Sequence, residues 1–447
     1  MFVEKLLGKK PDLLALCDTE PGFFPALLES QSLSEKTGRY DILFAAPSSE
    51  YVAYDQQQLD ELLKVVDTAP GQLTTTQQAF DSPFQFGWLV YFSYESAYLL
   101  EPKLTHLMSQ SSEPLAAAIY CQGAVIYDHM TGQATLWAES GKVANTIEKF
   151  LKKGRTFKEK SAELKQIEQA DGSEFEQAVI VAKELIQAGD IYQANLSRQY
   201  KCNTNTHLSA SHIMSRLRAA NPAPFAGLLQ LNDFAVVSSS PERLFKVSGG
   251  VIETRPIAGT RPRGASETVD LALIDELIKT PKERAEHIML IDLGRNDMGR
   301  VCQVGTVQVD ELMAVESYQH VHHIVSNITG QLKLDVTFVD VLKALFPGGT
   351  ITGCPKIRCM EVIQDIERHN RGCYTGSMGY INHDGQVDLN ILIRTVAMKD
   401  EEITFNAGAG IVYDSDPKAE LQETRYKAKG LLNALGLNVL DDEQTTQ

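Results

Sequence analysis

The most constraining feature of this sequence is a series of three β-rich runs near its C-terminal end. They cover residues 376–381, 388–398 and 402–413, and two short polar turns separate them, His383-Asp384-Gly385-Gln386 and Lys399-Asp400-Glu401. Strands joined by such short turns pair antiparallel, because a parallel connection needs a crossover of roughly a dozen residues or more. The chain is therefore predicted to contain an antiparallel sheet.

Helical patterns alternate with strands in the same part of the chain. One helix is predicted to begin at Ser173, where Ser173 and Glu176 match a capping box, and to end at Gly189. A strand from Ile191 to Tyr200 follows directly. Clear helices mixed with an antiparallel sheet place the chain in the α/β class, of the α+β type.

Length and charge distribution indicate how the chain is organised. With 447 residues, 43% of them hydrophobic, the protein needs two domains or one large composite fold. We predict a β-rich N-terminal region over 1–150, a charged surface connection over 151–172, a catalytic region over 173–440 and a polar tail over 441–447.

Composition excludes several classes of partner and site. The formal charge of −16 disfavours nucleic acid and anionic membranes, since both repel an acidic surface. No apolar run is long enough for a membrane helix and the N-terminus does not resemble a secretory signal, so we expect a cytoplasmic protein. The 7 cysteines include no Cys-x-x-Cys pair, which predicts neither a disulfide framework nor a zinc site.

Two glutamates in helical segments are predicted to be buried, and each then needs a cation. Glu286 shares an apolar helix face with Leu290 and Leu293, and Glu423 lies on a helix opened by Pro417. An unpaired carboxylate in such a place costs on the order of several kcal/mol. An oxygen-ligated Mg²⁺ would satisfy both acids. The spacing alone leaves open the alternative of two solvated helix residues.

A set of motifs in a fixed order covers the second half of the chain. Together they resemble the chorismate-utilising enzymes, which include anthranilate synthase component I, aminodeoxychorismate synthase component I, and the isochorismate and salicylate synthases. The matching segments are 189–198, 239–243, 255–264, 285–287 with 292–297, 323–326, 353–358, 393–395, 407–410 and 422–424. Weaker matches at 27–30 and 40–42 extend the resemblance to the N-terminal region.

The resemblance implies a fold and a set of site residues. The fold is a large antiparallel β-sandwich with helices packed outside, and the substrate is chorismate. The implied Mg²⁺ ligands are Glu286 and Glu423, with Glu420 nearby. The implied catalytic positions are Glu242 as general acid, His323 beside the leaving group, Gln193, and Ala258 at the position of a family lysine. The implied substrate-binding residues are Gly259, Thr260, Tyr374, Arg394, Gly408, Gly410 and Lys427.

The residue at position 193 bears on the nucleophile. Isochorismate and salicylate synthases resemble this chain but carry a lysine there, a base that activates water. Gln193 cannot take a proton at neutral pH, so the resemblance implies ammonia as the nucleophile.

Ammonia can enter at C4 or at C2 of the ring, and the sequence contains signals for both. Three segments resemble the aminodeoxychorismate branch, which aminates C4: 193–196, where anthranilate synthases usually read Gln-Val-Val-Pro, 376–380 and 91–95. Ala258 instead matches the anthranilate branch, which aminates C2 and eliminates pyruvate. Many aminodeoxychorismate synthases carry a nucleophilic lysine at that position, and alanine cannot form its covalent intermediate. We favour amination at C4 and keep anthranilate synthesis as the alternative.

The resemblance also implies partners. No Gly-x-Cys-x-Gly nucleophile elbow of a glutaminase occurs, so a separate glutamine amidotransferase subunit is expected to supply the ammonia. Leu27-Leu28-Glu29-Ser30 resembles the family's tryptophan-binding element, so bound tryptophan is a further expectation. A non-catalytic, chorismate-binding scaffold is disfavoured because the implied catalytic residues are present together.

Overall fold

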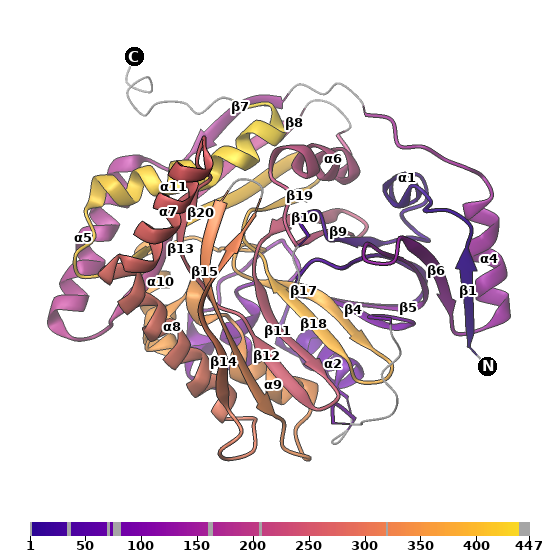
Figure 1. Cartoon of the computed structure of the whole chain (residues 1–447), viewed down its shortest axis with the longest axis horizontal. Helices are drawn as coiled ribbons and strands as arrows, with labels where there is room; N and C mark the ends of the chain where they lie inside the picture. Colours follow the sequence, from indigo (N-terminus) through magenta and orange to yellow (C-terminus); the bar gives the residue numbers. More distant parts are fainter. Residues whose placement is uncertain are drawn as a thin grey trace.

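A computed structural model describes most of the chain as strands surrounded by helices (Figure 1). The described residues are 2–33, 37–68, 72–74, 82–159, 164–204, 208–318 and 321–437. The predicted polar tail over 441–447 lies outside them.

The strands are distributed along the whole described chain and differ in length. Their bounds are β1 Val3–Leu7, β2 Ala26–Glu29, β3 Tyr40–Ala53, β4 Gly87–Phe92, β5 Ala116–Asp128, β6 Gln133–Ala138, β7 Leu164–Gln169, β8 Gln193–Thr204, β9 Phe225–Gln230, β10 Phe234–Ser240, β11 Arg243–Ser248, β12 Val251–Thr254, β13 Ile257–Pro262, β14 Gln308–Ser317, β15 Val321–Gln331, β16 Gly353–Cys354, β17 Ser377–Asn382, β18 Val387–Ile391, β19 Thr395–Lys399 and β20 Glu402–Ile411.

The helices connect these strands. Their bounds are α1 Leu13–Thr19, α2 Gln56–Val66, α3 Ser96–Leu100, α4 Gly141–Leu151, α5 Gly172–Ala188, α6 Ala210–Ala220, α7 Glu267–Lys279, α8 Pro281–Gly299, α9 Phe338–Leu345, α10 Lys356–Glu367 and α11 Pro417–Leu435, with 3₁₀ turns η1 Pro102–Leu107 and η2 Gly349–Ile351.

The described strands form one connected 20-stranded sheet that branches at β5. One arm runs β5-β3-β2-β9-β10-β19-β20-β8. The other arm runs β5-β4-β17-β18-β11-β12-β15. All of these pairs are antiparallel, as the short turns predict.

An apolar core joins the two arms face to face. It brings Phe44 and Phe234 of the first arm against Tyr91 and Met378 of the second, and all four side chains are almost fully buried. Burial of each such side chain contributes roughly 1.5–3 kcal/mol. The inner faces of the arms therefore form a β-sandwich.

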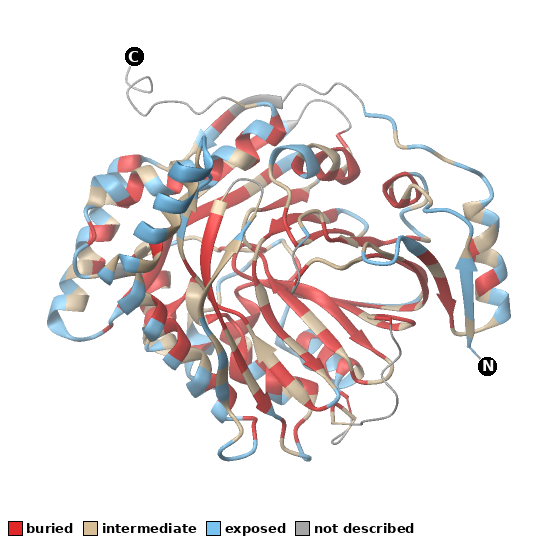
Figure 2. Ribbon diagram, in the orientation of Figure 1, coloured by how far each residue is buried: buried red, intermediate tan, exposed pale blue. Residues whose placement is uncertain are grey.

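Helices cover the outer faces of this sandwich. Helices α2, α3 and α9 contribute to one outer cluster, and α1, α6 and α11 to another. Figure 2 shows the expected result, with buried strands at the centre and helices exposed on their outward sides. The predicted α+β class and the antiparallel sandwich with outer helices are confirmed.

Two local predictions are wrong. The helix predicted from Ser173 begins at Gly172, and its N-cap is Asp171, whose carboxylate accepts a hydrogen bond from the Ser173 amide at 2.9 Å. An acidic cap so close to the helix start also complements the helix dipole, which explains why it displaces the Ser173–Glu176 capping box. Gly189, in the left-handed conformation, ends the helix as predicted.

The strand predicted over 388–398 is also wrong, because it divides into β18 and β19. Arg394 lies in the break with a φ of 52°, a value that strand residues do not adopt. The backbone therefore turns at Arg394, between the end of β18 and the start of β19.

Strands from both sides of the predicted connection pair directly. β2 pairs with β9 and β4 with β17, so the regions 1–150 and 173–440 contribute to the same sheet. The predicted connection over 151–172 contains β7, which pairs with β8. The domain division remains a prediction from sequence. Among the described residues, no helix is long and apolar enough to cross a membrane.

Candidate active site

A cavity of about 660 Å³ lies where the ends of the two arms meet helices α8 and α11. Its wall includes every site residue that the sequence analysis named, although these residues come from distant parts of the chain. They are Gln193, Glu242, Ala258, Gly259, Thr260, Glu286, His323, Tyr374, Arg394, Gly408, Gly410, Glu420, Glu423 and Lys427. The chemical roles assigned to them remain predictions.

Two helices bring the predicted metal ligands to the cavity. Proline occupies the first turn of both α8 and α11, and the Asp416 carboxylate caps α11 by accepting from the Ala419 amide at 2.9 Å. Glu286 is half-buried and accepts a hydrogen bond from Gln193 Nε2 at 2.9 Å. Carboxylates from α8 and α11 therefore face the same space.

The predicted burial of Glu423 is wrong. Its side chain is 48% exposed and forms an i,i+4 ion pair with Lys427 at 2.7 Å. The buried face of α11 passes instead through Glu420, Leu421 and Thr424. Helical spacing shows which residues share a face, and packing decides which face turns inward.

Glu283 is a further carboxylate at the cavity, and it was not predicted from the sequence. It lies one turn before Glu286 on α8, where Oε1 pairs with Arg261 at 2.6 Å and Oε2 is buried without a hydrogen bond in the described structure. The i,i+3 spacing to Glu286 was the available signal. An all-oxygen donor set with an unsatisfied carboxylate oxygen fits Mg²⁺. No three His, Cys, Asp or Glu side chains in the described ranges are close enough to hold a metal ion by themselves.

Glu242 is the buried acid of the cavity. It is 5% exposed, and its Oε1 accepts a hydrogen bond from Thr350 Oγ1 at 2.9 Å. Burial raises the pKa of Glu242 to about 7, although the Thr350 hydrogen bond opposes this rise. A carboxyl group that keeps its proton near neutral pH can act as a general acid.

His323 lies next to the predicted substrate-binding turn. Its Nδ1 is 3.0 Å from Thr260 Oγ1 and 3.4 Å from the Gly259 carbonyl oxygen. Burial, and secondarily the charge of Arg394, lower the pKa of His323 to about 4. The imidazole is therefore neutral at physiological pH. Gly259 has a φ of 65°, which a residue with a side chain adopts only with strain.

Arg394 contributes a positive charge to the cavity wall. Burial lowers its pKa, while the nearby Glu242 carboxylate raises it. Its guanidinium makes no hydrogen bond or ion pair with the residues that the structure describes, and its left-handed backbone is unusual for arginine. A desolvated guanidinium facing a cavity is suited to a bidentate carboxylate ligand.

Two glycines of β20 shape the opposite wall. A Cβ at Gly410 would lie 2.5 Å from Gln193 Nε2, and one at Gly408 would collide with Tyr374 Oη and lie 2.9 Å from Asn195 Oδ1. Side chains at these positions would fill the cavity. The glycines therefore let the backbone approach a ligand closely.

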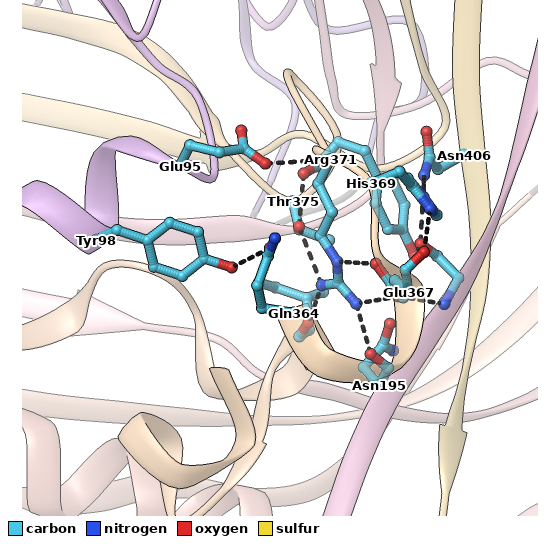
Figure 3. Close-up of polar contacts among 12 residues, drawn as sticks. Glu95, Tyr98, Asn195, Gln364, Glu367, His369, Arg371, Thr375 and Asn406 are labelled. Atoms are coloured by element: carbon cyan, nitrogen blue, oxygen red, sulfur yellow. Dashed lines mark hydrogen bonds and ion pairs between the residues drawn. The ribbon is translucent and has the colours of Figure 1, made fainter. Parts of the chain in front are cut away.

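A buried network around Arg371, which the sequence analysis also missed, joins the cavity wall to the sheet (Figure 3). The Arg371 guanidinium donates to Glu367 at 2.7 and 2.9 Å and to the Asn195 carbonyl oxygen at 2.6 Å. The backbone amides of Arg371 and Gly372 donate to the Glu95 carboxylate at 2.6 and 3.0 Å. Arg371 thus fixes Asn195 and, through the chain that follows, Tyr374.

The segment predicted to bind tryptophan lies away from these cavity residues. Leu27 and Leu28 belong to β2, between β3 and β9. Glu29 forms an ion pair with Arg218 at 2.6 Å, and the Ser30 amide donates to Asp41 at 3.0 Å. These contacts hold this segment against α6 and β3. Tryptophan binding stays a prediction.

The sequence matches a known family over nearly its full length. A family model described as chorismate binding enzyme matches residues 27–433. This chain belongs to the chorismate-binding enzyme family.

Curated relatives of this chorismate-binding enzyme include both kinds of aminating synthase. The anthranilate synthase component I-like protein of Synechocystis sp. is 45% identical over 359 residues, which cover 79% of this chain and 73% of the relative. Anthranilate synthase component 1 of Aquifex aeolicus is 37% identical, and the match covers 93% of this chain and 90% of the relative. Aminodeoxychorismate synthase component 1 of Bacillus subtilis is 46% identical over 264 residues, which cover 59% of this chain and 56% of the relative.

A solved structure supports the same assignment. The crystal structure of anthranilate synthase component I from Streptococcus pneumoniae matches with a TM-score of 0.76 and 30% identity, covering 89% of this chain and 93% of that chain. The protein is therefore a chorismate-utilising enzyme.

Proposed function

We propose that this enzyme aminates chorismate at C4 to give 4-amino-4-deoxychorismate, with Mg²⁺ and with ammonia from a separate glutamine amidotransferase subunit. The product would enter 4-aminobenzoate and folate biosynthesis. The component 1 names of the relatives support a separate ammonia-supplying subunit.

The observation that carries the choice of C4 is the junction around Arg371. All three segments that resemble the aminodeoxychorismate branch meet there. Asn195 accepts from Arg371, Glu95 accepts from the Arg371 amide, and β17 pairs with β4 through Ser377 and Phe92. The segments thus form one structural unit, which borders the cavity through Gln193 and Asn195 of the segment 193–196. Residues that pack together support a common role better than three separate resemblances do.

The cavity residues have complementary roles in this proposal. Glu286, Glu420 and Glu423 would hold Mg²⁺, with Glu283 beside them. When bound, the metal would supply positive charge for the ring carboxylate of chorismate. Arg394, Tyr374, Lys427 and the amides of Gly408 and Gly410 would bind the substrate's carboxylates.

In this proposal, a buried side chain carries out the proton transfer. Protonated Glu242 would donate to the departing C4 hydroxyl, and neutral His323 with Thr260 would orient the reacting ring. Gln193 provides no base, which suits ammonia because neutral ammonia, unlike water, attacks without first losing a proton. Ala258 excludes an enzyme adduct at its position, so the activation of C2 must come from a free nucleophile or be bypassed by direct entry at C4.

Anthranilate synthesis is the second candidate. Ala258 favours it, and so do the anthranilate synthases among the relatives. In that reaction ammonia adds at C2 and pyruvate is eliminated.

Product analysis separates the two functions. The purified chain is incubated with chorismate, Mg²⁺ and ammonium at about pH 8.5, with and without aminodeoxychorismate lyase, and the products are identified by chromatography with mass detection. We expect a product that keeps the enolpyruvyl group and yields 4-aminobenzoate with the lyase. Anthranilate and pyruvate would overturn the proposal.

A further inference from the structure

Two hollows lie next to the active-site cavity. The first, here called the outer groove, measures about 780 Å³, and its wall includes Asp292, Asp297 and Lys356. The second, here called the inner cavity, measures about 40 Å³, and its wall includes Asp297, Glu242 and Thr350. Glu242 and Thr350 also line the active site. The inner cavity therefore lies between the active site and the outer groove, with which it shares Asp297.

The inner cavity is suited to water. Three of the residues that line it have no side chain, namely Gly294, Gly348 and Gly349. The lining also includes the polar side chains of Glu242, Thr350 and Asp297. A space of this size with several polar partners can hold a few water molecules in a hydrogen-bonded chain.

Glu242 lies at the inner end of this cavity. Its Oε1 accepts a hydrogen bond from Thr350 Oγ1 at 2.9 Å, which fixes the carboxyl group at the boundary with the active site. Arg394 and Lys427 are the positive charges that act on Glu242. In the proposed reaction, Glu242 gives its proton to the C4 hydroxyl, which leaves as water. The resulting carboxylate must regain a proton before the next turnover.

A buried ion pair lies at the outer end. Asp297 Oδ2 on α8 is 2.7 Å from Lys356 Nζ on α10, and the two side chains are 9% and 13% exposed. Burial raises the pKa of Asp297, although Lys356 and the nearby Arg300 oppose this rise. Burial also lowers the pKa of Lys356. The two shifts bring the proton affinities of the pair closer together, which favours exchange of a proton.

Asp297 borders both hollows and therefore connects solvent in the outer groove with the inner cavity. We propose that Asp297 returns protons from solvent to Glu242 through water in the inner cavity. A solvent proton binds the Asp297 carboxylate and then passes along the water chain to the Glu242 carboxylate, so only a proton moves. Asp297 acts through Glu242 and does not touch the substrate. The inference rests on the proposed role of Glu242, and it holds for either product because both aminations release the C4 hydroxyl as water.

The incoming ammonia is the competing source of this proton, because its nitrogen loses one proton when it becomes an amine. If that proton went to Glu242, Asp297 would have no part in turnover. In our proposal it leaves toward the open side of the active site, where the side chains of Glu423 and Lys427 are 48% and 45% exposed. The two routes therefore differ in their dependence on Asp297.

Asp297→Asn tests the proposal, because it keeps the shape of the side chain and removes the group that carries the proton. Turnover is measured as chorismate consumption at a fixed ammonium concentration. We expect kcat to fall roughly tenfold while the KM for chorismate stays within about twofold. Imidazole near neutral pH should restore part of the lost kcat by delivering protons from the outer groove, and it should not change wild-type kcat.

Asp292→Asn is the matched control. Asp292 lies on the same helix and lines the outer groove, and its side chain is 65% exposed. This variant should keep the wild-type kcat and show no response to imidazole.

Wild-type kcat in Asp297→Asn would overturn the proposal and assign the proton to ammonia. A loss of kcat that imidazole does not relieve would also overturn it, since the ion pair would then have a purely structural role. If Asp297→Asn does not fold because Lys356 is left without its counter-charge, Asp297→Asn combined with Lys356→Gln removes both charges and must show the same loss and rescue. Product identity in wild type decides only which carbon is aminated.

Discussion

The Gln193 side chain donates a hydrogen bond of 2.9 Å from Nε2 to the Glu286 carboxylate. The bond connects β8 to α8 across 93 positions of sequence. A neutral amide positions the carboxylate without cancelling its charge, so Glu286 remains an anionic ligand for a cation.

Glu286→Gln is expected to reduce Mg²⁺-dependent turnover by roughly 100-fold or more, because an amide supplies no anionic oxygen to the metal. Turnover is measured across an Mg²⁺ titration, and folding is followed by circular dichroism. Asp292→Asn is the control, since Asp292 lies on the same helix with its side chain 65% exposed. Wild-type turnover in Glu286→Gln would contradict the metal assignment.

Glu242→Gln is expected to abolish turnover and to change how stability depends on pH. Burial raises the pKa of Glu242 from 4.5 to about 7, so the folded state keeps a proton that the unfolded chain loses between these values. Wild-type stability therefore falls as pH rises through this interval, by roughly 3 kcal/mol in total. The glutamine variant has no such loss.

Urea unfolding of both proteins at pH 5 and pH 8 checks this prediction. The stability of Glu242→Gln relative to wild type should rise by roughly 2–3 kcal/mol between the two pH values. The same difference at both pH values would show that Glu242 titrates normally.

Arg394→Ala is expected to raise the KM for chorismate roughly 30-fold or more, since it removes a desolvated cation from the carboxylate site. Arg394→Lys should recover only part of the affinity, because lysine lacks the bidentate geometry. Arg368→Ala is a matched control: Arg368 also has a positive φ, 54°, but it is exposed at the end of α10. An equal rise in the KM for chorismate in both alanine variants would mean that the effect comes from substitution at a backbone position with positive φ, and not from loss of the Arg394 guanidinium.

Ala258→Lys is expected to alter the ratio of products or to form a trapped covalent adduct. Ala258 is 6% exposed on β13, pairs with Ile324, and lines the cavity. A lysine there would place a nucleophilic amine beside the substrate ring. Intact-protein mass spectrometry after incubation with chorismate detects the adduct, and chromatography detects the products. An unchanged profile with no adduct would mean that position 258 is not near C2.

Local signals predicted the parts of the fold that depend on neighbouring residues. The turn at Gly385 and the helix stop at Gly189 were correct because glycine adopts positive φ with little cost. The ordered motifs predicted the family, and every site residue taken from them lies around one cavity. Turn residues, helix stops and family motifs each depend on a few neighbouring residues, so they can be recognised from short segments of sequence.

The sequence by itself determined the family, the antiparallel sheet and the identity of the residues around the cavity. Only the tertiary structure decided which α11 glutamate is buried, since both Glu420 and Glu423 fit the helical pattern and packing selects the face. It also decided the bond from Thr350 to Glu242 and the Arg371 network. These interactions join residues far apart in the chain, and burial energies that depend on the whole fold, rather than local conformational preference, hold them together.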